Sequence, residues 1–200
     1  RAATGALCNL VTCEPILEAI DNGTDAGKRH VRIFLVLSQS EDTDTVRYAA
    51  SALANLAAFP PAALLVAEGE GFGLKKLVGL LSYGVAEIVH PAAHALAALC
   101  GREGGTLVSG DWYPPADKAK AWTKIMLDEG ILPPLLLLQA NLVASHPAQP
   151  IVIVLLENLN VWWQTPLSAA QAISLKTSSE CSQALHTWMT VTNDESDEIE

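Results

Sequence analysis

Alanine and leucine recur along the chain at spacings of three and four residues, the pattern of a helix with one buried face. The clearest stretch holds Ala49, Ala52, Leu53 and Leu56. Alanine is the best helix former and has a small side chain, so helices with such a face pack closely. Alternation with a period of two, which marks a strand, is confined to the short stretch 151–154. The pattern predicts an all-α protein.

This apolar pattern occurs four times. Each copy ends in a leucine, preceded by one position that holds Asn9, Asn55 and Asn158 in three copies and Ala98 in the remaining one. Units that recur in this way are predicted to stack on their sequence neighbours and to share a continuous core. The four copies are RAATGALCNL at 1–10, RYAASALANL at 47–56, HPAAHALAAL at 90–99 and PIVIVLLENL at 150–159.

A second apolar stretch precedes each of the last three copies, and glycine opens it. These stretches end at Leu37, Leu81 and Leu138. The repeating unit is therefore predicted to be a helix, a short loop and a second helix. We expect one solenoid over 1–192, followed by an acidic tail. The predicted bounds are about 1–20, 22–60, 62–102 and 116–163 for the units, 167–190 for terminal helices and 193–200 for the tail.

The length of the unit selects a fold class. Units of about 40–47 residues with two or three helices are typical of armadillo and HEAT solenoids. The glycine entry, the Leu-Leu helix end and the alanine-rich second helix resemble the armadillo version, and GILPPLLLLQ at 130–139 resembles the second helix of an armadillo repeat. The sequence therefore predicts an all-α, right-handed armadillo-type helical-repeat solenoid.

Composition narrows the classes of partner. The chain has 12 Lys and Arg against 22 Asp and Glu, so its formal charge of −10 would repel a phosphate backbone and disfavours nucleic acid as a partner. No apolar run approaches the about 20 residues of a membrane span, so we expect no membrane segment. Four scattered cysteines predict reduced thiols in a cytoplasmic protein. Because the chain opens with Arg1 rather than Met, we expect a piece of a longer protein.

The opening segment resembles a particular family. RAATGALCNLV at 1–11, followed by an acidic loop and a second alanine-rich helix with Asn55, is similar to the UCS-domain family of myosin-directed chaperones. The likeness extends from Arg1 to about Ala58, and beyond about Ala62 it is armadillo-like only. The resemblance implies a solenoid that holds the myosin motor domain and helps it to fold. Family members often carry an amino-terminal module for a heat-shock chaperone, and the chain does not contain that module.

The repeated asparagine is the main candidate binding residue. In armadillo solenoids this helix lines the groove, and an exposed amide offers both a donor and an acceptor to the backbone of an extended peptide. The alternative is a local role, in which the amide bonds carbonyls near a helix end. Ala98 interrupts any such track. The predicted partner-binding residues are Asn9, Tyr48, Ser51, Asn55, Asn158 and Trp162, which follows Asn158 by four positions.

Two other groups of residues have both a binding and a structural interpretation. Arg1, Arg47 and His90 share the first position of the repeated helix, where a cation is poorly placed, so they are expected to pair either with a ligand carboxylate or with an acidic neighbour such as Glu41 or Asp44. All five tryptophans follow residue 110, and they serve either as interface anchors or as core. Glycine and proline at 101–117 predict an exposed loop, so Trp112 and Tyr113 are expected to be exposed.

No combination of residues predicts catalysis. His90 and His94 share a helix face, but they lack the glutamate of a zinc-protease motif and a third ligand. GEGFG at 69–73 follows a predicted helix rather than a strand, so it is not expected to bind phosphate. We therefore expect no enzyme, no metal and no cofactor. Two functions stay open: a myosin-directed chaperone domain, and a generic armadillo scaffold or adaptor that binds an extended peptide of another partner.

Overall fold

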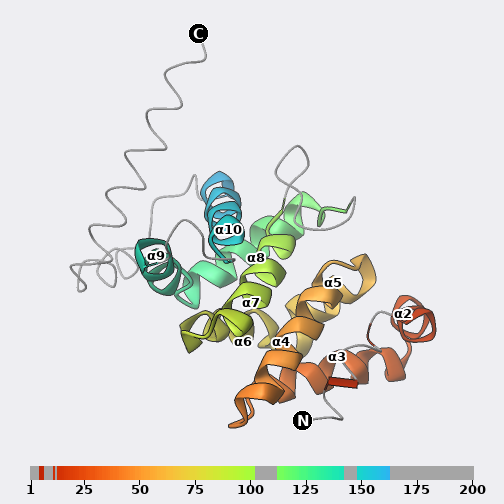
Figure 1. Ribbon diagram of the computed structural model, residues 1–200. Helices are drawn as coiled ribbons and strands as arrows, with labels where there is room; N and C mark the ends of the chain where they lie inside the picture. The colour runs from red at the N-terminus through yellow and green to blue at the C-terminus, as the bar shows by residue number, and fades with distance from the viewer. Residues whose placement is uncertain (1–4, 7–10, 12, 102–111, 142–147, 163–200) are drawn as a thin grey trace.

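The computed structural model describes residues 5–6, 11, 13–101, 112–141 and 148–162, and this part of the chain is helical without a strand. More than half of the 200 residues lie in its α-helices. The helices follow one another along the molecule from α2 to α10 (Figure 1). The terminal helices predicted at 167–190 and the tail at 193–200 lie outside the described residues.

Three helices, rather than the predicted two, make up each unit. The predicted two-helix unit left out the first helix of each triplet. The first unit consists of α2 (Glu14–Asp21), α3 (Asp25–Leu37) and α4 (Thr43–Ala57); the second of α5 (Pro60–Glu68), α6 (Gly73–Leu80) and α7 (Ala86–Leu99); the third of α8 (Ala116–Asp128), α9 (Leu132–Asn141) and α10 (Gln149–Trp162). Short 3-10 turns flank α6 at Gly69–Gly71 and Leu81–Tyr83.

Local sequence signals explain where these helices begin. The side chain of Thr24 accepts a hydrogen bond from the amide of Gly27 at 3.1 Å and caps α3. Asp42 accepts one from the amide of Thr45 at 3.0 Å and caps α4. α4 therefore begins at Thr43, four residues before the segment that repeats, and Arg47 lies in its second turn rather than at its start.

Proline acts differently at two places in the fold. Pro60 and Pro61 follow α4 and open α5, because the first turn of a helix does not need their missing amide hydrogens. Pro91 lies inside α7. Since proline has no N–H, α7 lacks the hydrogen bond that this residue would donate to the Glu87 carbonyl.

The predicted glycine entry reflects close contact between helices. A Cβ at Gly27, in the first turn of α3, would lie 2.5 Å from the Ala19 carbonyl oxygen of α2. A Cβ at Gly73, at the start of α6, would lie 1.8 Å from the Val66 carbonyl oxygen of α5. Both glycines therefore let the second helix of a unit cross directly over the backbone of the first.

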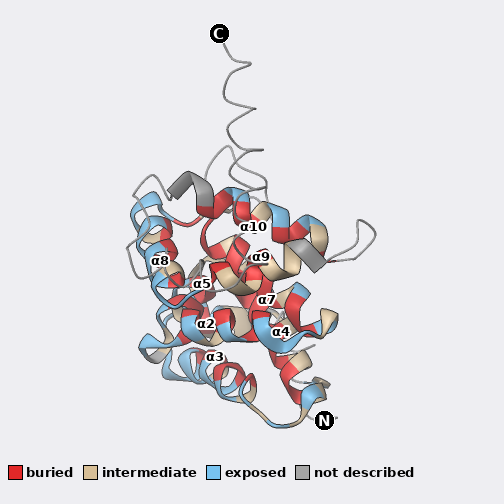
Figure 2. Cartoon of the chain, turned by 90° about the vertical axis from the view of Figure 1, so that its left-hand side faces the viewer, coloured by how far each residue is buried: buried red, intermediate tan, exposed pale blue. Residues whose placement is uncertain are grey.

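The core lies where successive third helices pack together. α7 packs against α4 on one side and α10 on the other, and the buried residues gather between the helices (Figure 2). The predicted apolar face is confirmed, since Leu53 and Leu96 are fully buried. The buried alanines allow the close approach; Ala49, Ala50 and Ala52 of α4 and Ala92, Ala93 and Ala95 of α7 all have no exposed surface.

Candidate functional site

The third helices present one partly exposed face, which we call the third-helix face. On α4 and α7 the residues of this face occur at matching positions, separated by buried residues that point into the stack. In Figure 1, α4, α7 and α10 lie in one row. The face consists of Asp44, Arg47, Tyr48, Ser51 and Asn55 on α4, Glu87, His90, Pro91, His94 and Ala98 on α7, and Ile153, Val154 and Glu157 on α10.

The α4 part carries a charged and aromatic cluster. Arg47 forms an ion pair with Asp44 at 3.2 Å, as expected for an acidic neighbour, and its guanidinium carbon lies 4.8 Å from the centroid of the Tyr48 ring. A Cβ at Gly5 would lie 3.4 Å from that ring. The half-buried tyrosine therefore lies close to both the guanidinium and Gly5, and the cation–π contact is present without a ligand.

Asn55 and Ser51 differ in what they offer to a ligand. Asn55 is exposed, so its amide is available as both donor and acceptor. The hydroxyl of Ser51 is half-buried and donates to the Arg47 carbonyl of its own helix at 3.1 Å. Ser51 therefore retains acceptor capacity only, and Asn55 is the predicted residue on α4 that is best placed to contact a backbone.

The α7 part of the face is built from imidazoles and a proline. His90 is exposed and His94 half-buried, one turn apart. Pro91 lies between them, and its missing N–H leaves the Glu87 carbonyl without the usual intrahelical donor. Ala98 occupies the position that corresponds to Asn55, as the sequence repeat predicts.

On α10 the structure corrects the predicted register by three residues. The exposed and half-buried residues Ile153, Val154 and Glu157 occupy the positions of His90, Pro91 and His94. The sequence alignment had matched Leu159 to Leu56, whereas the burial pattern matches it to Leu53. The position equivalent to Asn55 is consequently Val161, and Asn158 corresponds to the buried Ala52 and Ala95.

Asn158 is therefore a structural residue rather than an exposed groove residue. It is 3% exposed, and its Nδ2 donates to the Ala97 carbonyl oxygen at 3.2 Å. That carbonyl belongs to the last turn of α7, where helix geometry supplies no intrahelical donor. The amide thus connects the third unit to the second. Asn158 therefore fits the alternative role of the repeated asparagine, a bond to a carbonyl near a helix end.

The structure describes only some of the remaining predicted residues. Asn9 and Arg1 lie outside the described residues, and the side chain of Trp162, the last residue of α10, is also outside them. The expectation that Trp112 and Tyr113 are exposed is wrong: both are half-buried, and Trp112 packs against the core. Trp122 of α8 is buried, which supports the core interpretation for that tryptophan.

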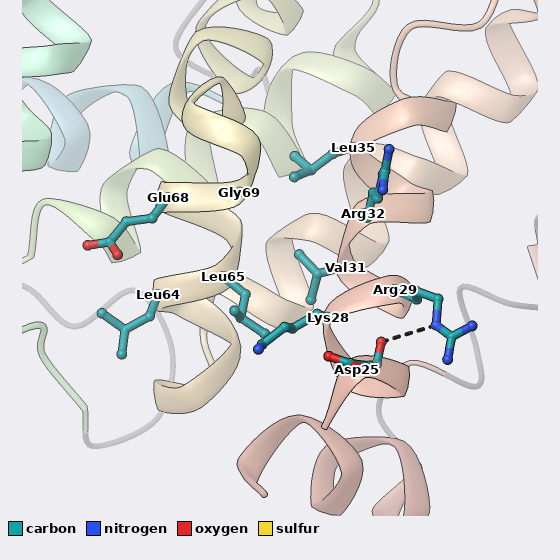
Figure 3. Close-up of a pocket in the computed structure, with 10 residues that line it drawn as sticks. All are labelled: Asp25, Lys28, Arg29, Val31, Arg32, Leu35, Leu64, Leu65, Glu68 and Gly69. Carbon is teal, nitrogen blue, oxygen red and sulfur yellow. Dashed lines mark hydrogen bonds between the residues drawn. The ribbon is translucent and has the colours of Figure 1, made fainter. Parts of the chain in front are cut away.

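A hollow that sequence reasoning missed lies between α3 and α5 (Figure 3). This α3–α5 pocket has a volume of about 680 Å³ and shares no residue with the third-helix face. A sequence signal for it exists, because Lys28, Arg29 and Arg32 form a basic cluster in an acidic chain. Its lining is Asp25, Lys28, Arg29, Val31, Arg32, Leu35, Leu64, Leu65, Glu68 and Gly69.

The described residues give little support to metal binding, to a reactive thiol at Cys100 or to a membrane-spanning helix. Among them, no three His, Cys, Asp or Glu side chains lie close enough together to hold a metal ion. Burial raises the pKa of the Cys100 thiol far above its ordinary value, which disfavours the reactive thiolate. Within the same part of the chain, no helix is both long and apolar enough to cross a bilayer.

Solved structures resemble this arrangement. One engineered protein, a Northeast Structural Genomics Consortium target, matches 92% of the chain with 24% identity and a TM-score of 0.60. A second engineered protein from the same consortium matches 80% of the chain with 24% identity and a TM-score of 0.55. The match spans 42% of the first protein's length and 64% of the second's.

The chain is an all-α armadillo-type repeat solenoid. The three-helix units with stacked third helices carry this assignment. The two engineered proteins share the fold. A computationally designed armadillo repeat protein for modular peptide recognition matches 72% of the chain at a TM-score of 0.47 and 20% identity. No protein-family model matches the chain, and no curated protein matches it.

Proposed function

We propose that the chain is a binding scaffold that holds an extended peptide segment of a partner protein across the third-helix face. The observation that carries this proposal is the exposed amide of Asn55, next to the preorganised Arg47 and Tyr48 on the same helix. An extended segment has unpaired backbone donors and acceptors on both sides, and an exposed amide satisfies one of each.

The spacing of the helices fits such a ligand. Packed helices lie about 8–10 Å apart, and an extended chain advances about 3.3 Å per residue, so each third helix meets every second or third residue of the peptide. Side chains would then meet polar and aromatic groups on α4, imidazoles on α7, and Ile153 and Val154 on α10. We therefore expect the peptide to place an apolar side chain over α10.

The proposal is tested by selecting binders from a library of random twelve-residue peptides with the full chain, then measuring their Kd by fluorescence anisotropy. Asn55→Ala should weaken binding about 5- to 150-fold, which corresponds to about 1–3 kcal/mol for an amide that pairs with backbone groups. The melting temperature of the Asn55→Ala variant should stay close to that of the wild type, because the exposed Asn55 side chain contributes little to the free energy of folding.

Asn22→Ala is the matched control, since Asn22 is also exposed but lies at the end of α2. It should bind the selected peptides like the wild type. If Asn55→Ala binds normally but melts earlier, Asn55 is a structural residue and the proposed peptide contact is wrong.

A second candidate function is a myosin-directed chaperone domain in the cytoplasm. The observation in its favour is RAATGALCNLV at 1–11, with its likeness to the UCS-domain family. The chain should then retain purified myosin motor domain in a pull-down and suppress its heat-induced aggregation, with citrate synthase as the unrelated client. Equal action on both clients, or on neither, would count against a myosin-directed role.

A further inference from the structure

The α3–α5 pocket has an apolar floor and a basic edge. Val31 and Leu35 are buried, Leu65 is half-buried, and Leu64 is 39% exposed at the α5 side. Figure 3 shows Lys28 pointing from α3 toward α5, while Arg29 and Arg32 line the α3 side. Leu35 packs against the backbone at Gly69, where a Cβ would lie 2.6 Å from its Cδ1.

The charge at this pocket is opposite to that of the chain as a whole. Three basic and two acidic side chains line the pocket, although acidic residues outnumber basic ones 22 to 12 in the sequence. One of the two acids, Glu68, is engaged by Lys118 at 2.6 Å. The Nε of Arg29 donates to the Asp25 backbone carbonyl at 3.2 Å, and Figure 3 shows its guanidinium directed away from α5.

We infer that the α3–α5 pocket binds a short acidic segment of a partner protein, with one apolar side chain on the floor and carboxylates at the basic edge. The charge complementarity selects the acidic partner, because Lys28 and Arg32 are one helical turn apart, about 6 Å along the axis. Alternate carboxylates of an extended segment have nearly the same separation. The total charge of −10 disfavours nucleic acid as the source of the negative charge.

The pocket volume and its position support a dedicated site. About 680 Å³ lies within the range of small-ligand sites, and it exceeds what a single leucine side chain fills. No lining residue belongs to α4, α7 or α10, so the third-helix face stays open when the pocket is occupied. The inference thus goes beyond the proposed peptide track and does not depend on it.

The test uses a fluorescein-labelled peptide, acetyl-Glu-Asp-Leu-Asp-Glu-amide, and the full chain in fluorescence anisotropy. We expect saturable binding with one site that weakens as salt is raised. A peptide with serine in place of leucine should bind several-fold more weakly, and a peptide with Asn and Gln in place of the acids should not bind measurably. Equal binding of all three peptides would overturn the inference.

Charge-reversal variants locate the site. Lys28→Glu should weaken binding at least about fivefold, since an attraction is replaced by a repulsion. Lys124→Glu is the matched control, because Lys124 is exposed on α8 and the same charge is reversed outside the pocket. Leu64→Gln should weaken binding of the leucine peptide but not of the serine peptide. If Lys28→Glu and Lys124→Glu bind equally and both melt like the wild type, the pocket is not the site.

The acidic tail of the chain is the competing occupant. A variant with the tail neutralised should bind the probe peptide within about twofold of the wild type. If the probe binds only after neutralisation, the tail occupies the pocket and the inference of a partner segment is wrong. The neutralising changes are Asp194→Asn, Glu195→Gln, Asp197→Asn, Glu198→Gln and Glu200→Gln.

Discussion

Two asparagines that look equivalent in the sequence have different environments. Asn55 is exposed on α4, and Asn158 is buried at the contact between α7 and α10. A three-residue change of register separates them, because a shift of three residues rotates a side chain by about 60° around the helix axis, enough to move it from the exposed face into the buried one. The residue type alone therefore does not decide whether an amide binds a partner or a neighbouring helix.

Asn158→Ala should destabilise the protein by about 1–3 kcal/mol, because the Ala97 carbonyl would stay buried without the amide donor. Chemical denaturation monitored by circular dichroism measures this change. Asn55→Ala is the control and should alter the free energy of unfolding by less than about 0.5 kcal/mol. Equal effects of the two substitutions would contradict the different burial of the two residues.

Cys100 should react slowly with iodoacetamide at pH 8, since the thiol is buried and its pKa is raised by burial. Cys13 is half-buried and should be alkylated faster. Peptide mass spectrometry of the native protein gives both rates, and alkylation in denaturant should remove the difference. Comparable native rates would mean that the end of α7 opens readily.

At the scale of the helix, side chains of one unit cap a helix of the preceding unit. Lys76 of α6 donates to the Leu35 carbonyl of α3 at 3.1 Å, and Asn158 of α10 donates to the Ala97 carbonyl of α7. Both acceptors lie in a last turn, where four carbonyls lack intrahelical donors. Together with the apolar contact between the units, these hydrogen bonds fix the spacing of the units.

Leu53→Ala and Leu96→Ala should each cost about 2–5 kcal/mol, as buried leucine truncations do. Both leucines occupy the same position of a third helix, so similar costs are expected. Leu64→Ala, at an exposed position on α5, should cost less than about 1 kcal/mol. Denaturant titration of the three variants checks the order, and a neutral Leu53→Ala or Leu96→Ala would show that the apolar face is assigned incorrectly.

The sequence predicts the third helices well because their alanine and leucine face repeats clearly. It does not assign α5 to the repeating unit, since PPAALLVAE is apolar almost throughout and has no polar face that would mark a period. It misplaces α10 because Leu-x-Asn-Leu at 156–159 aligns with the repeat three residues away from the register of the buried face, which the burial of Asn158 reveals. The α3–α5 pocket depends on two helices whose packing no local pattern specifies.

For the whole molecule, the stacking order means that each unit depends on its neighbours. The first and second units meet through α4 and α7, and the second and third through α7 and α10. In a solenoid of this kind the stability is close to a sum of unit and contact contributions. Binding at the third-helix face spans all three units, whereas binding at the α3–α5 pocket involves only the first two.

The position of α7 between two neighbours has a consequence for amide hydrogen exchange. A helix packed on both sides opens only when both contacts are lost, whereas, within the described residues, α4 and α10 each pack against one other third helix. Exchange measured by mass spectrometry should therefore be slowest in peptides from Ala92–Leu99 and faster in those from α3. Pro91 carries no amide hydrogen, so the slow region should begin after it. Uniform exchange along α4, α7 and α10 would indicate that the described part of the solenoid opens as a single unit.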